Sequence, residues 1–373
     1  MRVLYDGVIY RIQKYGGVVR YFNGLIHNLP ERLHPILLAP NRPAVPPSHP
    51  NLSTHIETCG PLLWPIKPLR KKIIAQRTCR RMKTENPDVL HPTYYYSSLR
   101  HLSGEIQIPT VLTVYDLIHE RFPAQMDPYG KQVRLKKSAL SRADAVICIS
   151  ESTRRDLQKY YNVPDERITV IHLGSDFQPL ENVPVSTDSQ PYLLYVGERN
   201  FYKNFERSLT AFANAAASRP DIRLRCIGGK PFSKTEQEQI ASLGLPGRVT
   251  HEGYLEDSAM KSVYTDARAV IYPSLYEGFG IPILEGMSCG TAVLTSNRAS
   301  MPEVAGNAAL IFDPYSIDEI TASIEQVFDS ESAREELIRK GLQRAGEFSW
   351  QESARKTVEV YRSVAARRLE DAA

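Results

Sequence analysis

The stretch from Ala269 to Gly290 constrains the fold more than any other part of the chain. It opens with the short apolar run Ala269–Tyr272, which is typical of a buried parallel strand. The glycine-rich segment 277–280 follows and predicts a tight turn, because glycine accepts positive φ angles. Pro282 then suits the first turn of a helix, which Gly290 ends. The stretch therefore predicts a strand, a turn and a helix whose N-terminal amides can bind an anion.

Two carboxylates, Glu277 and Glu285, flank this turn. A carboxylate can accept hydrogen bonds from two neighbouring hydroxyls at once, which suits a sugar or a ribose. Their spacing alone is a loose pattern that also fits two solvated glutamates on an ordinary strand-to-helix turn. Together with Gly-Phe-Gly at 278–280 and with Pro282, it predicts a nucleotide-sugar pocket, in which amides bind phosphate and carboxylates bind hydroxyls.

Residues 273–285, Pro-Ser-Leu-Tyr-Glu-Gly-Phe-Gly-Ile-Pro-Ile-Leu-Glu, resemble the Glu-x7-Glu motif of the retaining glycosyltransferases of family 4. The resemblance continues through 295–297 and 302–309, and it covers most of the chain, least clearly residues 40–85. It implies an α/β chain with the GT-B fold, in which two Rossmann-like domains face an interdomain cleft.

The resemblance also implies roles for the residues around the turn. Glu285 would hold the ribose of the donor, and Glu277 would hold the hydroxyls of its sugar. The remaining donor-binding positions that the motif implies are Gly278, Phe279, Gly280 and Ile281.

The length of 373 residues favours two domains, and the pattern of alternating strands and helices occurs twice. We expect an acceptor-binding domain over 1–176 and a polar, proline-bearing linker over 177–190. The nucleotide-sugar-binding domain would follow over 191–347. The resemblance implies that the segment 348–373 is a helix that crosses back to the first domain. Proline-rich sequence over 40–68 predicts an irregular excursion within the first domain.

Two basic residues, Arg199 and Lys203, follow the first strand of the second domain. Arginine can bind a pair of oxygens and lysine supplies a point charge, so this pattern indicates a diphosphate. Family members carry an arginine and a lysine here on the donor diphosphate; Lys203 matches a common version, and Arg199 lies slightly off the usual register. The sequence contains no Asp-x-Asp, so we expect neither a metal ion nor a cofactor.

In the first domain, Gly16 and Gly17 precede a helix predicted over 19–29, which again presents helix amides to a phosphate. The resemblance places this loop near the donor phosphates and the acceptor. Family members often have His-Asp at the end of a later strand, where this chain has Tyr-Asp116, with His119 one turn on. Asp116 and His119 are therefore candidate catalytic residues. Whether His119 replaces the histidine of the family or is structural stays open.

Three further residues follow predicted strands of the second domain, namely Gly197, Gly228 and Tyr254. Family members hold the nucleobase between the two turns that contain Gly228 and Tyr254, largely through backbone atoms. These residues are therefore predicted to bind the donor, while the identity of the base does not follow from the side chains.

The first half of the chain carries more Lys and Arg than Asp and Glu, and the second half carries fewer. A basic amphipathic stretch over 70–83, with Trp64 upstream, fits either an anionic membrane surface or a surface helix packed on the core. The sequence contains no long apolar run and its five cysteines are scattered, and its opening residues resemble a strand, so we expect no signal peptide. We expect a cytoplasmic chain, with peripheral contact at the inner membrane face as an open alternative and no nucleic-acid partner.

The opening residues 5–22 and the segment 113–123 look most like bacterial mannosyl or rhamnosyl transferases of surface polysaccharide assembly, such as O-antigen. The resulting hypothesis is metal-independent, retaining transfer of a hexose, with a GDP-linked mannose or rhamnose favoured over UDP-sugars. The acceptor would be a saccharide or a lipid-linked oligosaccharide. Two alternatives remain: a nucleotide-sugar epimerase on the same fold, and a non-catalytic nucleotide-binding partner of another transferase.

Overall fold

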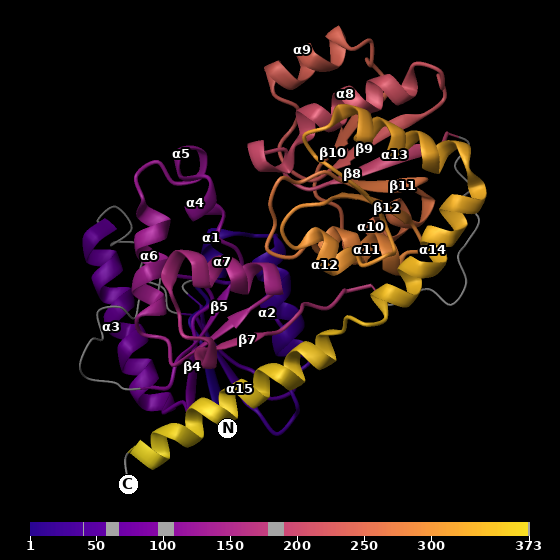
Figure 1. The fold of residues 1–373 in the computed structure, drawn as a ribbon. Helices are drawn as coiled ribbons and strands as arrows, with labels where there is room; N and C mark the ends of the chain where they lie inside the picture. The colour runs from indigo at the N-terminus through magenta and orange to yellow at the C-terminus, as the bar shows by residue number, and fades with distance from the viewer. Residues whose placement is uncertain (40, 57–66, 96–107, 178–189, 372–373) are drawn as a thin grey trace. The chain divides into compact units, whose positions relative to one another are not determined.

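The computed structural model describes residues 1–39, 41–56, 67–95, 108–177 and 190–371. The chain divides into two compact units (Figure 1). Unit 1 comprises Met1–Gly174 and Trp350–Ala373, and unit 2 comprises Ser175–Ser349. Residues 178–189 of the predicted linker lie outside the described residues.

Unit 1 is a parallel sheet with helices on both of its faces. Its strands are β1 (Arg2–Tyr5), β2 (His34–Ala39), β3 (Ser53–Ile56), β4 (Val89–His91), β5 (Val111–Val114), β6 (Ala145–Cys148) and β7 (Ile168–Val170). Its helices are α1 (Ile9–Ile12), α2 (Gly17–His27), α3 (Lys67–Glu85), α4 (Ile118–Arg121), α5 (Pro123–Met126), α6 (Lys131–Leu140), α7 (Glu151–Tyr161), η3 (Asp165–Arg167) and α15 (Trp350–Asp371).

The strands of unit 1 run in the order β3-β2-β1-β4, and a parallel bridge between Leu90 and Thr110 continues the sheet into β5-β6-β7. The central strands are fully buried, as expected for a parallel sheet that is covered on both faces. The closing helix α15 packs on α2, where Gly24 makes room for Trp350. A Cβ atom on Gly24 would lie 2.5 Å from the indole ring, so this contact requires glycine.

A buried hydrogen-bonded network also ties α15 to the sheet. His91 lies with Nδ1 2.6 Å from the hydroxyl of Tyr361 and Nε2 2.9 Å from the hydroxyl of Thr113. The Tyr361 hydroxyl is in turn 3.0 Å from that of Tyr5. Burial lowers the pKa of His91 to about 3, so the imidazole is neutral at physiological pH.

Unit 2 is a six-stranded parallel sheet in the order β10-β9-β8-β11-β12-β13. Its strands are β8 (Tyr192–Val196), β9 (Arg223–Ile227), β10 (Val249–Glu252), β11 (Ala269–Tyr272), β12 (Ala292–Ser296) and β13 (Leu310–Phe312). Its helices are η4 (Phe201–Lys203), α8 (Phe205–Ala216), α9 (Lys234–Ser242), α10 (Asp257–Asp266), α11 (Ile281–Ser288), α12 (Met301–Ala305), α13 (Ile317–Asp329) and α14 (Glu331–Ala345).

The two units share one topology, which fixes where a ligand can bind. In unit 2 the chain proceeds from β8 outward to β9 and β10, then returns to β11 on the other side of β8 and proceeds outward again. In unit 1 the same reversal falls between β1 and β4. Parallel sheets bind ligands outside the carboxyl ends of the strands at such a switch point.

Two predictions of local structure were wrong. The segment 40–68, predicted to be irregular, contains β3, which pairs in parallel with β2. It is a largely exposed edge strand, so it lacks the apolar run that marks a buried strand. The helix predicted over 19–29 spans Gly17–His27, because Gly16, at φ +147°, is the residue that turns the chain into the helix.

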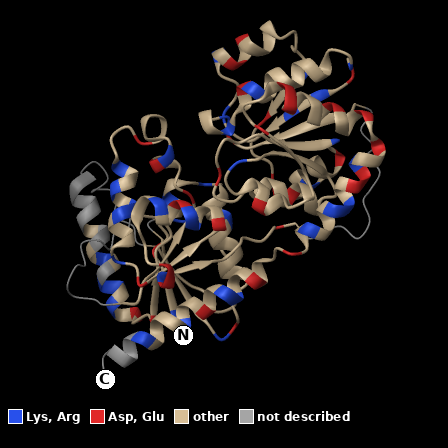
Figure 2. Ribbon diagram, in the orientation of Figure 1, with Lys and Arg blue, Asp and Glu red and all other residues tan. Residues whose placement is uncertain are grey.

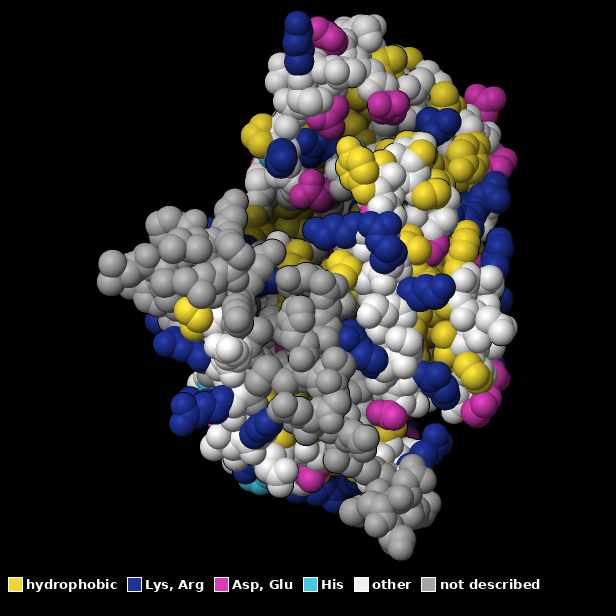
Figure 3. All heavy atoms as spheres, turned by 90° about the vertical axis from the view of Figure 1, so that its left-hand side faces the viewer, with side chains coloured by type: hydrophobic (Ala, Val, Ile, Leu, Met, Phe, Trp, Pro, Cys, Tyr) yellow, Lys and Arg dark blue, Asp and Glu magenta, His cyan; other side chains and the backbone are white. Residues whose placement is uncertain are grey.

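Several Lys and Arg residues of unit 1 lie along α6 and α7, where the ribbon of Figure 2 is blue. Lys131, Arg134 and Lys137 on α6 are exposed. Lys and Arg side chains of the described residues lie at several places on the face shown in Figure 3. The basic stretch 70–83 falls in α3, where Met82 is buried and Arg77, Arg80 and Lys83 are exposed; the side chains of residues 70–72, 74, 75 and 79 lie outside the description. In the described residues, no helix combines the length and hydrophobicity needed to span a bilayer.

Candidate functional site

An ion pair lies at the switch point of unit 2. The Nζ atom of Lys203, which follows β8, is 2.7 Å from Oε1 of Glu277, which follows β11. Asn204, at φ +57°, turns the chain from η4 into α8. Its side-chain amide donates to the carbonyls of Pro273 (3.2 Å) and Pro314 (2.7 Å), which fastens the Lys203 turn to the segment that leads to Glu277.

The hydroxyl of Tyr272, the last residue of β11, accepts a second hydrogen bond from Lys203, at 3.1 Å. Burial lowers the pKa of Lys203, but the nearby Glu277 carboxylate and their hydrogen bond outweigh it, and the pKa is raised. The ammonium is therefore charged. The side chains of Lys203 and Glu277 are 13% and 14% exposed, so both retain access to a ligand.

The loop that carries Glu277 is held from behind by a serine that the sequence analysis missed. The hydroxyl of Ser300, which is fully buried, lies 2.9 Å from the carbonyl of Glu277 and 2.8 Å from that of Phe279. Gly280, at φ +113°, is the N-cap of α11, and Ile281 is the first residue of that helix. Gly278, Phe279 and Gly280 are buried.

Glu285 differs from Glu277, although the motif pairs the two. It lies on α11 with 2% of its surface exposed, and its Oε2 accepts a hydrogen bond from the hydroxyl of Tyr264 at 2.6 Å. In this arrangement the carboxylate is buried against Tyr264 rather than open to a ribose. The ribose contact of Glu285 stays a prediction.

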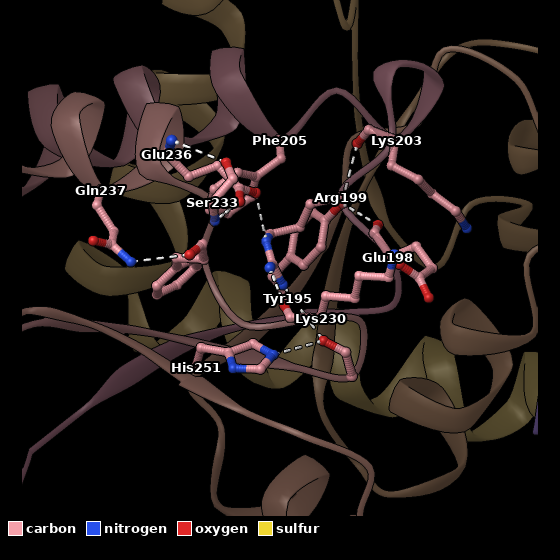
Figure 4. Close-up of polar contacts among 12 residues, drawn as sticks. Tyr195, Glu198, Arg199, Lys203, Phe205, Lys230, Ser233, Glu236, Gln237 and His251 are labelled. Atoms are coloured by element: carbon pink, nitrogen blue, oxygen red, sulfur yellow. Dashed lines mark hydrogen bonds and ion pairs between the residues drawn. The ribbon is translucent and has the colours of Figure 1, made fainter.

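Arg199 is not beside Lys203 in space, contrary to the expectation of a shared diphosphate site. Its Nε donates to Glu236 at 2.7 Å, and its terminal nitrogens donate to the carbonyls of Gly228 (3.4 Å) and Lys230. Figure 4 shows the side chains of Arg199 and Lys203 running in different directions. Only 4% of the Arg199 side chain is exposed, so the geometry does not favour a phosphate contact.

The glycines predicted to bind the donor lie at the carboxyl ends of β8 and β9. Gly197 and Gly228 have φ angles of +123° and +87°, which other residues rarely adopt. A Cβ atom on Gly197 would lie 3.9 Å from Nζ of Lys203, so this backbone borders the ammonium. Gly228 accepts a hydrogen bond from Nε2 of His251 at 3.0 Å. Tyr254 follows β10 and is half-exposed.

The candidates of unit 1 form separate groups. Gly16 is the N-cap of α2, and Gly17 is its first residue; both are exposed. Asp116 follows β5 and accepts the N–H of Ile118 at 3.1 Å, which shapes the start of α4. Its carbonyl accepts from Nζ of the fully buried Lys136 at 2.8 Å.

His119, on α4, is half-buried, and Nδ1 has no hydrogen-bond partner among the described residues. Its pKa is lowered, chiefly by burial, while the carboxylate of Asp116 acts in the opposite direction. Because Nδ1 is itself buried, it is not an open ligand contact in this structure, and the catalytic role of His119 stays a prediction.

The sequence analysis singled out Lys203 and Glu277, which the structure brings into contact, but it missed the residues that hold them. Tyr272 was assigned to the strand, and its position as the last strand residue before the turn is the signal that could have identified it. Ser300 and Tyr264 act across the fold, on residues at least 21 positions away, and no local pattern marks them.

Comparison with protein families gives two consecutive matches. Residues 15–178 match the family model described as Glycosyltransferase Family 4, and residues 176–344 match that described as Glycosyl transferases group 1.

Curated relatives include two from Escherichia coli. O-antigen chain mannosyltransferase B is 34% identical over 235 residues, which cover 60% of this chain and 62% of the relative. The serotype-specific mannosyltransferase WbdA is 28% identical over 271 residues, which cover 68% of this chain and 33% of the relative. The match thus spans less than two thirds of the length of either relative.

Solved structures of similar fold include two that match almost the whole chain. Sucrose-phosphate synthase from Thermosynechococcus elongatus has a TM-score of 0.80 at 21% identity and covers 98% of this chain and 99% of its own. WaaG, a glycosyltransferase involved in lipopolysaccharide biosynthesis, has a TM-score of 0.74 at 16% identity and covers 97% and 99%. At these identities the likeness shows the fold alone, and the fold is the predicted one, with two Rossmann-like α/β units.

Proposed function

Because this chain belongs to the glycosyltransferases of family 4 and group 1, which share the GT-B fold, we propose that it transfers a hexose from a nucleoside diphosphate sugar to a saccharide acceptor with retention of configuration. The observation that carries the proposal is the Lys203–Glu277 pair at the switch point of unit 2. It combines a charged ammonium and a carboxylate, both accessible, where a parallel sheet binds its ligand.

The two charges suit the two halves of a sugar diphosphate. The ammonium of Lys203 would attract the diphosphate and stabilise the charge that develops on it as the bond to the sugar breaks. Glu277 would then exchange part of its contact with Lys203 for the hydroxyls of the sugar. The departing phosphate would take the proton of the acceptor hydroxyl, so no separate protein base is required.

The proposed donor is GDP-mannose, with a rhamnose donor as the second choice. This choice is supported by the names of the curated relatives, two of which are mannosyltransferases of O-antigen or serotype-specific chains. The proposed acceptor is a saccharide or a lipid-linked oligosaccharide of polysaccharide biosynthesis. Exposed basic residues on α6 support an anionic partner of unit 1, either the phosphate of such an acceptor or an anionic membrane surface.

We further propose that transfer needs no metal ion, because Lys203 and the helix amides of α11 can meet the charge of the diphosphate. The corresponding expectation is that turnover with excess EDTA equals turnover with magnesium.

The test is a transfer assay with purified chain, GDP-mannose and a panel of mannose-containing oligosaccharides, with UDP-glucose and UDP-GlcNAc as comparison donors. We expect GDP release that depends on the acceptor, and an α-linked product from the α-linked donor by NMR. Release of GDP or UDP at the same rate without acceptor, or a β-linked product, would contradict the proposal.

A further inference from the structure

Arg199 and Lys203 are close in sequence but contact different parts of unit 2. Given that the donor is a nucleoside diphosphate sugar, as proposed above, we propose that Arg199 and Glu236 are a positioning pair. They hold the turn 228–230 for the nucleoside half of the donor, and Arg199 is not a ligand of the diphosphate.

Two aromatic rings lie close to the guanidinium of Arg199. Its Cζ lies 4.8 Å from the ring centroid of Phe232 and 5.7 Å from that of Phe205. These distances are within the range of cation–π attraction. A phosphate cannot approach the guanidinium through either ring.

The edge of the guanidinium is occupied as well. A bidentate phosphate contact needs two neighbouring N–H groups directed outward. In Arg199, one N–H of each nitrogen is already donated, to Glu236 and to the carbonyls of Gly228 and Lys230. The two remaining N–H groups belong to a side chain with only 4% of its surface exposed.

Glu236 connects this arginine to a helix terminus. Its Oε2 accepts the backbone N–H of Ser233 at 2.7 Å, while its own N–H donates to the Ser233 hydroxyl at 3.2 Å. This reciprocal arrangement is a capping box at the start of α9. Burial raises the pKa of Glu236, but the hydrogen bonds from Ser233 and Arg199 together lower it by more, so the net pKa is below its usual value.

The pair acts on a turn whose shape depends on outside support. Gly228 and Gly229 have φ angles of +87° and +71°, so this backbone has few preferences of its own. Arg199 holds it from the side of β8, and Nε2 of His251 holds the Gly228 carbonyl from the side of β10 (Figure 4). The turn is thus fixed between three strands.

The order of the strands indicates which part of the donor meets this turn. Glu277, Lys203 and the turn 228–230 follow β11, β8 and β9, which are consecutive in the sheet. Neighbouring strands are about 4.8 Å apart, so these positions span roughly 10 Å. A sugar, a diphosphate and a nucleoside laid across the strand ends occupy them in that order.

The decisive variant is Glu236→Gln, because the two roles of Arg199 predict opposite effects. Glutamine keeps the capping box, since it serves in the same position of that motif as glutamate, and removes only the charge that orients Arg199. If Arg199 positions the turn, GDP, GMP and guanosine should all bind about tenfold more weakly. If Arg199 instead binds phosphate, freeing it from Glu236 should leave the affinity for guanosine unchanged and increase the affinity for GDP.

The measurement is the Kd of GDP, GMP and guanosine by calorimetry, using the uridine series instead if the wild type prefers UDP. An equal loss of affinity for all three ligands supports the inference. A change of affinity confined to GDP overturns it. Glu238→Gln, an exposed change on the same helix, is the matched control and should bind all three normally.

Two further results separate the inference from the proposed function. Lys203→Ala should weaken the binding of GDP and leave the binding of guanosine unchanged, because it removes only a diphosphate contact. Arg199→Lys, which keeps the charge but cannot make the three contacts, should repeat the pattern of Glu236→Gln. A wild-type chain that binds neither GDP nor UDP contradicts the proposed function, and the inference falls with it.

Discussion

The switch points of the two units share a topology but differ in chemistry. In unit 1, the carboxylate of Asp6 follows β1 and is 3% exposed. It accepts from the backbone N–H of Thr93 at 2.8 Å, from the Thr93 hydroxyl at 2.7 Å and from the N–H of Val8 at 3.3 Å. In unit 2, the segments after the equivalent strands carry Lys203 and Glu277, which pair but remain accessible.

This difference shows that the fold provides a place for a ligand and the side chains decide whether it is used. Oδ1 of Asp6, after β1, accepts from two groups of Thr93, after β4, so these bonds tie together the segments that follow the two strands. The groups after β8 and β11 can exchange partners, because a ligand can reach both charges. The same topology thus supports a structural hydrogen-bond cluster in one unit and a candidate donor site in the other.

The largest expected effect is that of removing the ammonium in unit 2. Lys203→Ala should lower kcat by 10²-fold or more, equivalent to about 3 kcal/mol, because a preorganised charge for the leaving diphosphate is lost. The measurement is steady-state transfer from GDP-mannose. Lys234→Ala, at an exposed lysine of α9, is the control and should have normal turnover. Normal turnover of Lys203→Ala would mean that the switch point of unit 2 has no catalytic role, and the contrast between the units would fail.

The corresponding change in unit 1 should affect stability and not chemistry. Asp6→Asn keeps the shape but loses the charge that strengthens its hydrogen bonds, and should lower the free energy of unfolding of unit 1 by about 2 kcal/mol. Urea unfolding followed by tryptophan fluorescence measures this, because both tryptophans belong to unit 1.

The control for Asp6→Asn is Asp88→Asn, an exposed carboxylate that accepts a single backbone N–H from Arg2. It should change the free energy of unfolding by about 0.5 kcal/mol or less. If Asp6→Asn lowers turnover while stability is unchanged, the switch point of unit 1 has a chemical role, and the contrast between the units fails.

The sequence predicted the features that depend on local pattern. Buried strands such as Ala269–Tyr272 are apolar runs, and the turns around Gly16 and Gly280 need positive φ angles that only glycine adopts readily. The family motif brought Glu277 and Lys203 into one hypothesis, and the structure places them in contact.

What escaped prediction depends on contacts across the fold. Arg199 has the residue type and position of a phosphate ligand, and only the approach of Glu236, 37 positions later, commits it elsewhere. The burial of Glu285 against Tyr264 is equally non-local. The exposed edge strand β3 lacks the apolar pattern that reveals its neighbours, so it was missed. In each case, tertiary packing determines the outcome, and the local sequence does not encode it.

The buried network of unit 1 gives a pH-dependent test. The pKa of His91 is lowered to about 3, while in the unfolded chain it is near 6.5. Only the unfolded state takes up this proton between those values, so the stability of unit 1 should fall as pH drops below 6.5. The loss at pH 5.5 should be about 1.4 kcal/mol.

The readout for His91 is the change in the free energy of unfolding between pH 7.5 and 5.5, followed by tryptophan fluorescence. The His91→Gln variant has no titrating group at this position. It should be less stable than the wild type at both pH values, and its free energy of unfolding should fall less between pH 7.5 and 5.5. An identical slope in wild type and variant would mean that His91 is not the group responsible, and the network would then be irrelevant to acid sensitivity.

The smallest expected effect concerns the residue that supports Lys203 from the strand. Tyr272→Phe removes the hydroxyl that accepts from the ammonium at 3.1 Å and leaves the pair with Glu277 in place. It should lower kcat/KM by about fivefold, since one hydrogen bond of about 1 kcal/mol is lost. Tyr315→Phe, the same change at an exposed residue of unit 2, is the control and should leave transfer unchanged.

The size of the Tyr272→Phe effect sharpens the comparison between the units. A fivefold loss fits a hydroxyl that orients an ammonium already paired with a carboxylate. A loss as large as that of Lys203→Ala would mean that the hydroxyl itself contacts the reacting groups. No loss would mean that the ion pair alone fixes Lys203, because the alkyl chain is held by the turn that Asn204 fastens to Pro273 and Pro314.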